Sequence, residues 1–561
     1  MITSIKALIV VWPLLFASFF VATSVFAPIE DKKRLSRWGL VFLAATAAAF
    51  LIPNFWLATA IITALVLMLG ANEPLRPVLF FIVMFAAPPE TRDIPGIGGI
   101  NKFIPMSIAM AGVITLLLPC LFQKRPPIAR RGGAVGWAVA AFTALMAALA
   151  FRDTSVTDGL RIATVEFLTI AVIYFAVVKS IRTEKDMRAA ILALFIPLMA
   201  LATVALAEIL MQWHFYTEIK RSWGIAAFHE YTRRAGSIRA FTSQGDPISY
   251  GIYIASALGL ALGFFATKIN RQLATMGLVV FAAALVATLS RGPWLAAAVA
   301  AGVFALTGPN AAGRTAQLGL IALVGGLALL ATPFGGAIID LIPFIGDSGA
   351  ETISYREELL RTGAGVIGDH PLFGVSDPHG HPKMQSLIQG QGIVDIVNSY
   401  LSIGLHYGLT GLGLFLFAHL AAAASLWRAV GVAKRFDAVL AAQARGLLAA
   451  YCAYLAAIST TSSVGLMSEF GWILAALSVA SARVITAAAA ASSDVAMKAA
   501  NDAVAAGDGR RPADQPIAAA KPAVVQTRNG PRNGPTNEPQ KRPRLPAAQV
   551  PSHLRQYVRE D

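Results

Sequence analysis

The sequence has little charge and almost no cysteine. Charged side chains make up 14% of its 561 residues and hydrophobic ones 56%, whereas charged residues average about a quarter of a soluble domain. The two cysteines, Cys120 and Cys452, both fall inside apolar runs, so neither a disulfide framework nor a cysteine-based metal site is predicted. These shortages point away from a soluble globular protein.

Long apolar runs are what the chain has instead. Runs of about 15 to 25 residues recur from Ile5 to Ala488, and a helix of that length crosses a hydrocarbon layer roughly 30 Å thick. Open sheets leave backbone hydrogen bonds unsatisfied in lipid, so we expect an all-α polytopic bundle of about 12–15 transmembrane helices. The predicted spans lie near 5–27, 38–52, 55–71, 77–88, 104–122, 134–151, 160–181, 188–211, 247–267, 272–289, 294–308, 316–333, 396–424, 443–461 and 470–488.

The net charge of +15 gathers in short connectors and in the C-terminal tail. When fifteen spans alternate sides, the connectors rich in Lys and Arg all fall on one face, which the positive-inside rule assigns to the cytoplasm. The tail falls on that face too and, lacking apolar periodicity, is predicted to be disordered. Orientation therefore accounts for the basic charge, and we expect no nucleic-acid partner.

These assignments divide the chain into alternating membrane and loop regions. Two large loops fall on the external face. The regions are 1–211 (helices), 212–246 (external loop with arginines), 247–333 (helices), 334–395 (large external loop), 396–488 (helices) and 489–561 (disordered basic cytoplasmic tail).

The external loop 212–246 is basic, although positive charge there opposes the orientation rule. Planar guanidinium groups bind phosphate oxygens in bidentate fashion, so a phosphorylated substrate carried in the membrane would explain the charge. The alternative is pairing with loop carboxylates or lipid phosphates. The basic residues of this loop include Lys220, Arg221, Arg233, Arg234 and Arg239.

The segment Thr-Leu-Ser-Arg-Gly-Pro-Trp at 288–294 joins two apolar runs on the same external side. Its Gly-Pro pair predicts a tight turn. Arg291 is then held where two helices leave the hydrocarbon, and an ionisable residue so placed is a functional candidate. The alternative is that Arg291 snorkels to a lipid head group.

The loop 334–395 and the run after it hold the remaining polar motifs. Residues 355–366 have the pattern of an amphipathic helix. His379 and His381 lack a third ligand at ordinary zinc spacing, so no metal site is predicted. The motif residues are Tyr355, Arg356, His370, His381, Asp395, Asn398, Tyr400 and His406.

The order of these motifs resembles the O-antigen ligase and Wzy-type polysaccharide polymerase family of the bacterial envelope. The order is Arg-x-Phe with Pro-Ile, Ser-Arg-Gly-Pro, Tyr-Arg with His-Pro-Leu-Phe-Gly-Val, and Asn-Ser-Tyr-Leu, across about residues 230–415. The resemblance implies a GT-C-like glycosyltransferase of the bacterial inner membrane with two large periplasmic loops. Its substrates would be undecaprenyl-diphosphate-linked glycans, with no cofactor and no metal.

The resemblance also implies roles for single residues. Arg239, Arg291 and Arg356 would contact the diphosphate, because fixed guanidinium groups stabilise the charge that develops on such a leaving group. The acceptor hydroxyl needs a base or an orienting acceptor, and Asp395, His381 and His406 remain open as candidates. Further substrate-binding candidates are Arg233, Arg234, Tyr355, His370, Asn398 and Tyr400.

Ligases of this family carry a histidine immediately before the Asn of the last motif, where this chain has Val397. This difference favours a polymerase that joins repeat units into exopolysaccharide, capsule or O-antigen. A ligase acting on lipid A core and a flippase for lipid-linked glycan are the alternatives. A transporter should carry ionisable groups near the midplane of the membrane, whereas Glu166 and Glu208 lie near the ends of their spans. Expected partners are membrane lipid, a chain-length regulator and other polysaccharide assembly proteins.

Overall fold

The computed structural model describes residues 2–96, 102–124, 133–225, 233–234, 236–265, 267, 269–313, 316, 319, 350–388, 394–462 and 464–505. Residues 1–497 form one structural unit, and the site discussed below lies within it. Helices dominate the described part of the chain, and the strands in it form two short antiparallel hairpins, β1 with β2 and β3 with β4.

The first half of the chain carries most of the elements. They are α1 (Ile2–Phe26), α2 (Lys32–Leu51), α3 (Phe55–Leu69), α4 (Arg76–Val83), β1 (Arg92–Pro95), β2 (Lys102–Met106), α5 (Ile108–Gly112), a π-helical turn η1 (Val113–Leu117), α6 (Leu118–Phe122), α7 (Gly133–Leu149), α8 (Val156–Glu166), a second π-helical turn η2 (Phe167–Val172), α9 (Ile173–Ser180), α10 (Glu184–Met211), α11 (Thr217–Ser222), β3 (Arg233–Arg234), β4 (Ser237–Ile238) and the 3₁₀ helix η3 (Thr242–Gln244).

The second half is made of longer helices. They are α12 (Pro247–Phe264), α13 (Arg271–Ala287), α14 (Arg291–Leu306), α17 (Ala350–Asp369), the 3₁₀ helix η5 (Gln385–Leu387), α18 (Ser399–Ala433), α19 (Ala438–Ala457) and α20 (Met467–Ala505). α18 is kinked at Gly408, whose backbone leaves the helical region with φ +66°.

The structure confirms a polytopic helical membrane protein. Among the described residues, eight helices are long and apolar enough to cross a membrane, and five shorter apolar helices accompany them. The expected span at 77–88 is only an eight-residue helix, α4, and the one at 104–122 begins within β2 and continues through the π-helical turn η1. The span expected at 316–333 lies outside the described residues.

One expectation about the tail is wrong in its first part. Disorder was expected from residue 489 onward, yet α20 continues to Ala505. Its extension is rich in alanine, which has the highest helix propensity of all residues, so it stays helical without an apolar stripe. Residues 506–561 lie outside the described residues.

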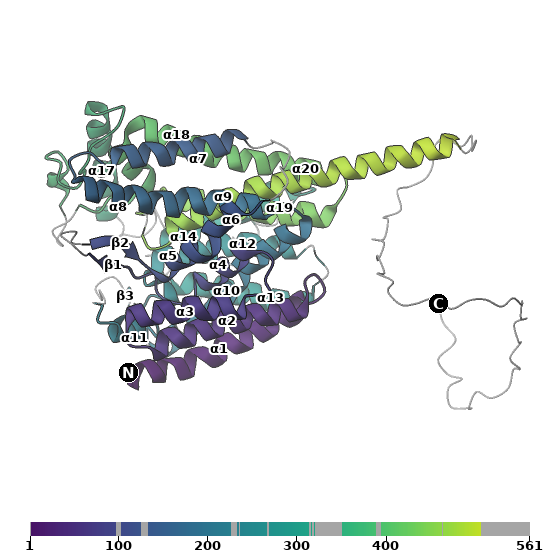
Figure 1. The fold of residues 1–561 in the computed structure, drawn as a ribbon, viewed down its shortest axis with the longest axis horizontal. Helices are drawn as coiled ribbons and strands as arrows, with labels where there is room; N and C mark the ends of the chain where they lie inside the picture. The colour runs from purple at the N-terminus through teal and green to yellow at the C-terminus, as the bar shows by residue number, and fades with distance from the viewer. Residues whose placement is uncertain are drawn as a thin grey trace, which may run out of the picture. The chain divides into compact units, whose positions relative to one another are not determined.

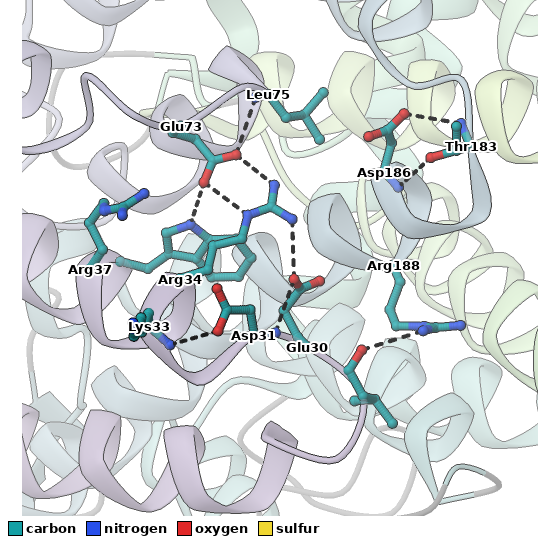
Figure 2. Close-up of polar contacts among 12 residues, drawn as sticks. Glu30, Asp31, Lys33, Arg34, Arg37, Glu73, Leu75, Thr183, Asp186 and Arg188 are labelled. Atoms are coloured by element: carbon teal, nitrogen blue, oxygen red, sulfur yellow. Dashed lines mark hydrogen bonds and ion pairs between the residues drawn. The ribbon is translucent and has the colours of Figure 1, made fainter. Parts of the chain in front are cut away.

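A buried ion-pair network fixes the turn between α1 and α2 (Figure 2). Arg34 pairs with Glu73 at 2.5 Å and with Glu30 at 3.2 Å, and the indole Nε1 of Trp38 donates to Glu73 at 2.9 Å. Breaking such a pair would leave an uncompensated buried charge, which is strongly destabilising. The network therefore ties the α1–α2 turn to the α3–α4 connection.

Small residues bring α12 and α19 into close contact. A Cβ built on Gly259 would stand 2.5 Å from the backbone nitrogen of Ala450, and one built on Gly263 would stand 3.1 Å from the Cα of Gly446. Small residues at such positions let the two backbones approach as they do between transmembrane helices. α14 packs against the same pair of helices, so the start of α14 is held by a rigid three-helix core.

The loops that carry the predicted motifs meet at one end of the bundle. Figure 1 shows β1, β2, β3, α11 and α17 at the end where the chain begins, at the start of α1. Two contacts join the β1 region to the loop 212–246: Arg92 donates to the carbonyl oxygen of Trp223 at 2.5 Å, and Lys220 pairs with Glu90 at 2.6 Å.

A small second core fixes α17 at this end. Leu359 and Val366 of α17 pack with Leu401 and Leu405 of α18, and each is less than a tenth exposed. Leu359 and Val366 are seven residues apart, and Leu401 and Leu405 are four apart, so the apolar side chains of each helix lie on one face. This core fixes the position of α17 and therefore the position of Arg356 on it.

Candidate anion-binding site

Arg239 is held against the turn that precedes α14. It lies in the segment between β4 and η3 and is only 6% exposed. Its Nε donates to the carbonyl oxygen of Thr288 at 3.1 Å, and its Nη2 donates to Oγ of Ser290 at 2.6 Å. The backbone N–H of Ala240 also donates to Ala287 at 2.9 Å. The loop 212–246 and the Ser-Arg-Gly-Pro turn therefore form one structure.

Arg234 and Arg291 stand beside Arg239. Nη1 of Arg234 donates to the carbonyl oxygen of Leu289 at 2.9 Å, and Arg291 is the first residue of α14. Burial and the nearby Arg291 lower the pKa of Arg234. Burial and the nearby Arg234 lower the pKa of Arg239 to about 10. Arg234 and Arg239 donate to residues 288–290, which directly precede Arg291, so these guanidinium groups share one region.

Arg356 reaches the same region from α17. Its Nη2 donates to the carbonyl oxygen of Thr460 at 3.1 Å, and a Cβ built on Gly292 would stand 2.7 Å from Oγ1 of Thr460. Burial lowers the pKa of Arg356, the nearby Asp395 raises it, and the nearby Arg291 lowers it. We call Arg234, Arg239, Arg291 and Arg356 the arginine cluster.

Asp395 is the predicted base that lies at the arginine cluster. Oγ of Ser462 donates to its Oδ1 at 2.9 Å, and the hydroxyl of Tyr355 donates to its backbone carbonyl oxygen at 2.9 Å. Burial and the Asp395 charge raise the pKa of Tyr355. The carboxylate therefore stands beside Arg356, with Tyr355 holding the backbone that carries it.

The structure separates the histidines from the arginine cluster. His370 follows α17 fourteen residues after Arg356, which is about 21 Å at 1.5 Å per helical residue. The ring of His381 is 6.3 Å from that of His370, and the ring of His406 is 6.1 Å from that of His379. Of the three predicted bases, His381 and His406 thus belong to a second group near the far end of α17.

Arg152, which sequence reasoning missed, holds this second group to α18. Its guanidinium donates to the carbonyl oxygens of Phe373 at 2.8 Å, Gly374 at 3.0 Å and His406 at 2.7 Å. Gly374 and Gly408 both have positive φ, +64° and +66°, as the close approach of the two backbones requires. The available signal was an arginine immediately after the apolar run 134–151.

The remaining predicted binding residues have other surroundings. Oδ1 of Asn398 accepts from the backbone N–H groups of Tyr400 and Leu401 at 3.0 and 3.1 Å, so it caps α18. The hydroxyl of Tyr400 donates to Leu455 at 2.8 Å. Arg233 is exposed on β3, as is Arg234, but it is Arg234 that donates to Leu289. Asn398 and Tyr400 therefore fix the start of α18 next to Asp395.

A cavity of about 160 Å³ with both polar and apolar walls lies near the start of α18. Its lining includes Glu166, Ser399, Ser402 and His419, and Nε2 of His419 is buried without a hydrogen-bond partner among the described residues. A cavity of this size and polarity admits water. The turn after α19 roofs it, since Ser399 donates to Ile458 and Thr461 of that turn at 2.9 and 2.8 Å.

The arrangement is suited to bind an anion that carries several charges. The guanidinium groups come from three separate segments, and each presents planar donors that match phosphate oxygens. In the part of the chain that the structure describes, no three His, Cys, Asp or Glu residues are grouped to hold a metal ion. Fold and site together define a polytopic membrane protein with a cationic site at one end of its bundle.

Comparison with known families agrees with this class. Residues 276–416 match the family model described as O-antigen ligase, which confirms the resemblance drawn from the motif order. The matched segment contains Arg291, Arg356 and Asp395, and also His381 and His406. Arg234 and Arg239 precede it. No curated protein matches the chain significantly. The match supports a ligase or polymerase-type function in glycan assembly, on lipid-linked glycan substrates.

Proposed function

We propose that the protein polymerises undecaprenyl-diphosphate-linked oligosaccharide repeat units at the periplasmic face of the bacterial inner membrane. The observation that supports the proposal is the arginine cluster with Asp395 beside it. The segments that form this site are spread along the sequence from Arg234 to Asp395. The basic connectors on the opposite face support a cytoplasmic C-terminal tail.

In this proposal the arginine cluster holds the diphosphate. When the bond between the sugar C1 and the phosphate oxygen breaks, the leaving undecaprenyl diphosphate gains negative charge. Donors already in place stabilise that charge in the transition state without reorganising. The guanidinium groups of Arg239 and Arg356 are fixed by bonds to Ser290 and Thr460, so they are organised before substrate arrives.

Asp395 is proposed to act on the acceptor. The hydroxyl oxygen of a second glycan forms the new bond to the sugar C1, and its proton passes to the Asp395 carboxylate. Only one of the Asp395 carboxylate oxygens has a hydrogen bond in the described structure, from Ser462, which leaves the other available. The Asp395 side chain also lies beside Arg356. A base for the acceptor hydroxyl must lie close to the bound diphosphate, which Arg356 is proposed to hold.

A polymerase is proposed over a ligase because Val397 stands where ligases carry histidine. The matched family includes ligases by its description, so lipid A core is the alternative acceptor. A chain-length regulator and other assembly proteins are the partners a polymerase would have.

The test is a reconstitution. Purified full-length protein is incubated in nanodiscs with a lipid-diphosphate repeat unit, and the product length is measured. R239Q, R291Q and R356Q should each leave single repeats unjoined. The control R221Q removes an exposed arginine paired with Glu218 and should polymerise normally.

Each other result has a meaning. If the three arginine variants still make long chains, the proposal is wrong. Transfer to added lipid A core without chain growth would favour a ligase. In cells, repeat units stranded on the cytoplasmic side would favour a flippase.

A further inference from the structure

Glu208 is a buried carboxylate in an unfavourable place. It lies in the last turn of α10, where the carbonyl ends of the helix repel negative charge, and it is fully buried. Burying a carboxylate is costly unless it receives hydrogen bonds. The hydrogen bonds that Glu208 accepts therefore indicate its structural role.

Those contacts go to the loop of Arg239. Oε2 of Glu208 accepts the backbone N–H of Phe241 at 3.1 Å and that of Thr242 at 3.0 Å. These two amides follow Arg239 by two and three residues. One carboxylate oxygen thus fixes the backbone immediately after the arginine that is bonded to Ser290.

The loop needs such an anchor. Thr242 has φ +50°, a strained conformation for a β-branched residue. Strain of this kind persists only where the surroundings impose it. His214 adds to the constraint: its ring stacks on that of Phe241 at 4.0 Å between centroids, and its Nδ1 is 3.8 Å from Oε2 of Glu208.

We infer that Glu208 is a positioning residue for Arg239. It fixes the backbone after Arg239, while the carbonyl oxygen of Thr288 and the hydroxyl of Ser290 hold the guanidinium. This inference rests on the proposed function for its effect on catalysis, although the anchoring itself is independent of it. Glu208 would not touch substrate.

The anchoring is tested by amide hydrogen exchange in the full-length protein in nanodiscs, without substrate. In E208A the amides of Phe241 and Thr242 should exchange at least about tenfold faster, because their acceptor is gone. E208Q keeps an acceptor oxygen and should restore protection. D437A is the matched control: the Asp437 side chain also accepts two backbone N–H groups, from Val439 and Leu440, but it caps α19. If E208A exchanges like the wild type, the inference is wrong.

The positioning role is tested by combining variants in the chain-growth assay. E208A should lower kcat about 10- to 100-fold with a smaller change in KM, since displacing a catalytic group costs about that much. E208Q should recover most of the rate. In the R239K background, E208A should have little further effect, because both changes act on one guanidinium. D437A combined with R239K should show independent effects.

Two failures can be told apart. If E208A and R239K multiply in full, Glu208 does not act through Arg239 and the inference fails. If R239Q and R239K both keep the full rate of chain growth, the proposed function of the arginine cluster fails, and the exchange experiment still decides whether Glu208 anchors the loop.

Discussion

The guanidinium of Arg239 donates to the hydroxyl of Ser290 at 2.6 Å, across 51 positions of sequence. Ser290 is 2% exposed and immediately precedes Arg291. Through this bond the basic loop before α12 and the turn before α14 act as one unit. The Ser290 hydroxyl is thus one of the contacts that join Arg239 to the turn before Arg291.

S290A should lower the rate of chain growth about tenfold. A hydrogen bond to a charged group contributes roughly 1.5–3 kcal/mol, and about 1.4 kcal/mol corresponds to a factor of ten in rate. Initial rates of product formation measure the effect. S256A is the control, because the Ser256 hydroxyl is buried but makes no hydrogen bond among the described residues. Equal rates for S290A and S256A would contradict the prediction.

Inorganic pyrophosphate should stabilise the wild-type protein against thermal unfolding. The lowered pKa values of Arg234 and Arg239 mean that their charged forms are less favourable in the folded protein than in the unfolded chain. At neutral pH both stay charged, so the folded state bears the cost of their burial and of repulsion from the neighbouring arginine until an anion pairs with them. At 100 times its Kd, a ligand adds about 2.7 kcal/mol.

The same reasoning predicts an effect without ligand. R234Q should raise the unfolding temperature of the ligand-free protein, because it removes a like charge from beside Arg291, and should weaken the response to pyrophosphate. Unfolding is followed in nanodiscs with EDTA present, so that no metal–pyrophosphate complex contributes. R221Q should respond as the wild type does. A lower unfolding temperature for ligand-free R234Q would contradict this account.

D395N should abolish chain growth with KM little changed, whereas H381A should keep most of the rate. The carboxylate lies beside Arg356, while His381 groups with His370, about 21 Å along α17 from Arg356. D377N is a matched control, since Asp377 is an exposed aspartate near the histidines. Loss of activity in H381A with activity kept in D395N would move the acceptor site to the histidine group.

Local sequence features allowed much of the fold and the arginine cluster to be predicted. Apolar run length follows from the thickness of the membrane, so α10 and α19 fall where runs were expected. Arg239, Arg291 and Arg356 could be chosen because the order of the motifs that contain them resembles the O-antigen ligase and polymerase family. The amphipathic pattern at 355–366 lies within α17.

Other features depend on tertiary structure and could not be predicted. No sequence pattern distinguished Asp395, His381 and His406 as candidate bases. The structure separates them because Asp395 lies beside Arg356 and His381 lies beside His370, and α17 holds these two regions apart. The two short hairpins were not predicted from the sequence. Strands such as β1 and β2 are stabilised by pairing with each other and show no alternating apolar pattern that would reveal them. Glu208 was noted as an acid in an apolar run, but its role depends on amides more than thirty residues away. The proposed roles of all these residues stay predictions.

G408A should destabilise the protein, whereas G413A should not. Gly408 has φ +66°, and a Cβ there would overlap the backbone of Leu372. A left-handed conformation in a residue other than glycine costs about 1–3 kcal/mol, and the overlap would push the 370–375 turn off α18 or straighten the kink.

Gly413 lies on the same helix with nothing within 4 Å of a built Cβ. Alanine there should be neutral or stabilising by about 0.5–1 kcal/mol, as in the middle of other helices. The unfolding temperature of the two variants in nanodiscs measures the difference. G408A should also weaken the bonds from Arg152 to Phe373 and Gly374, so R152A added to G408A should cost less than R152A alone. Full additivity would show that the kink and the Arg152 contacts are independent, and that the histidine turn is held to α18 in some other way.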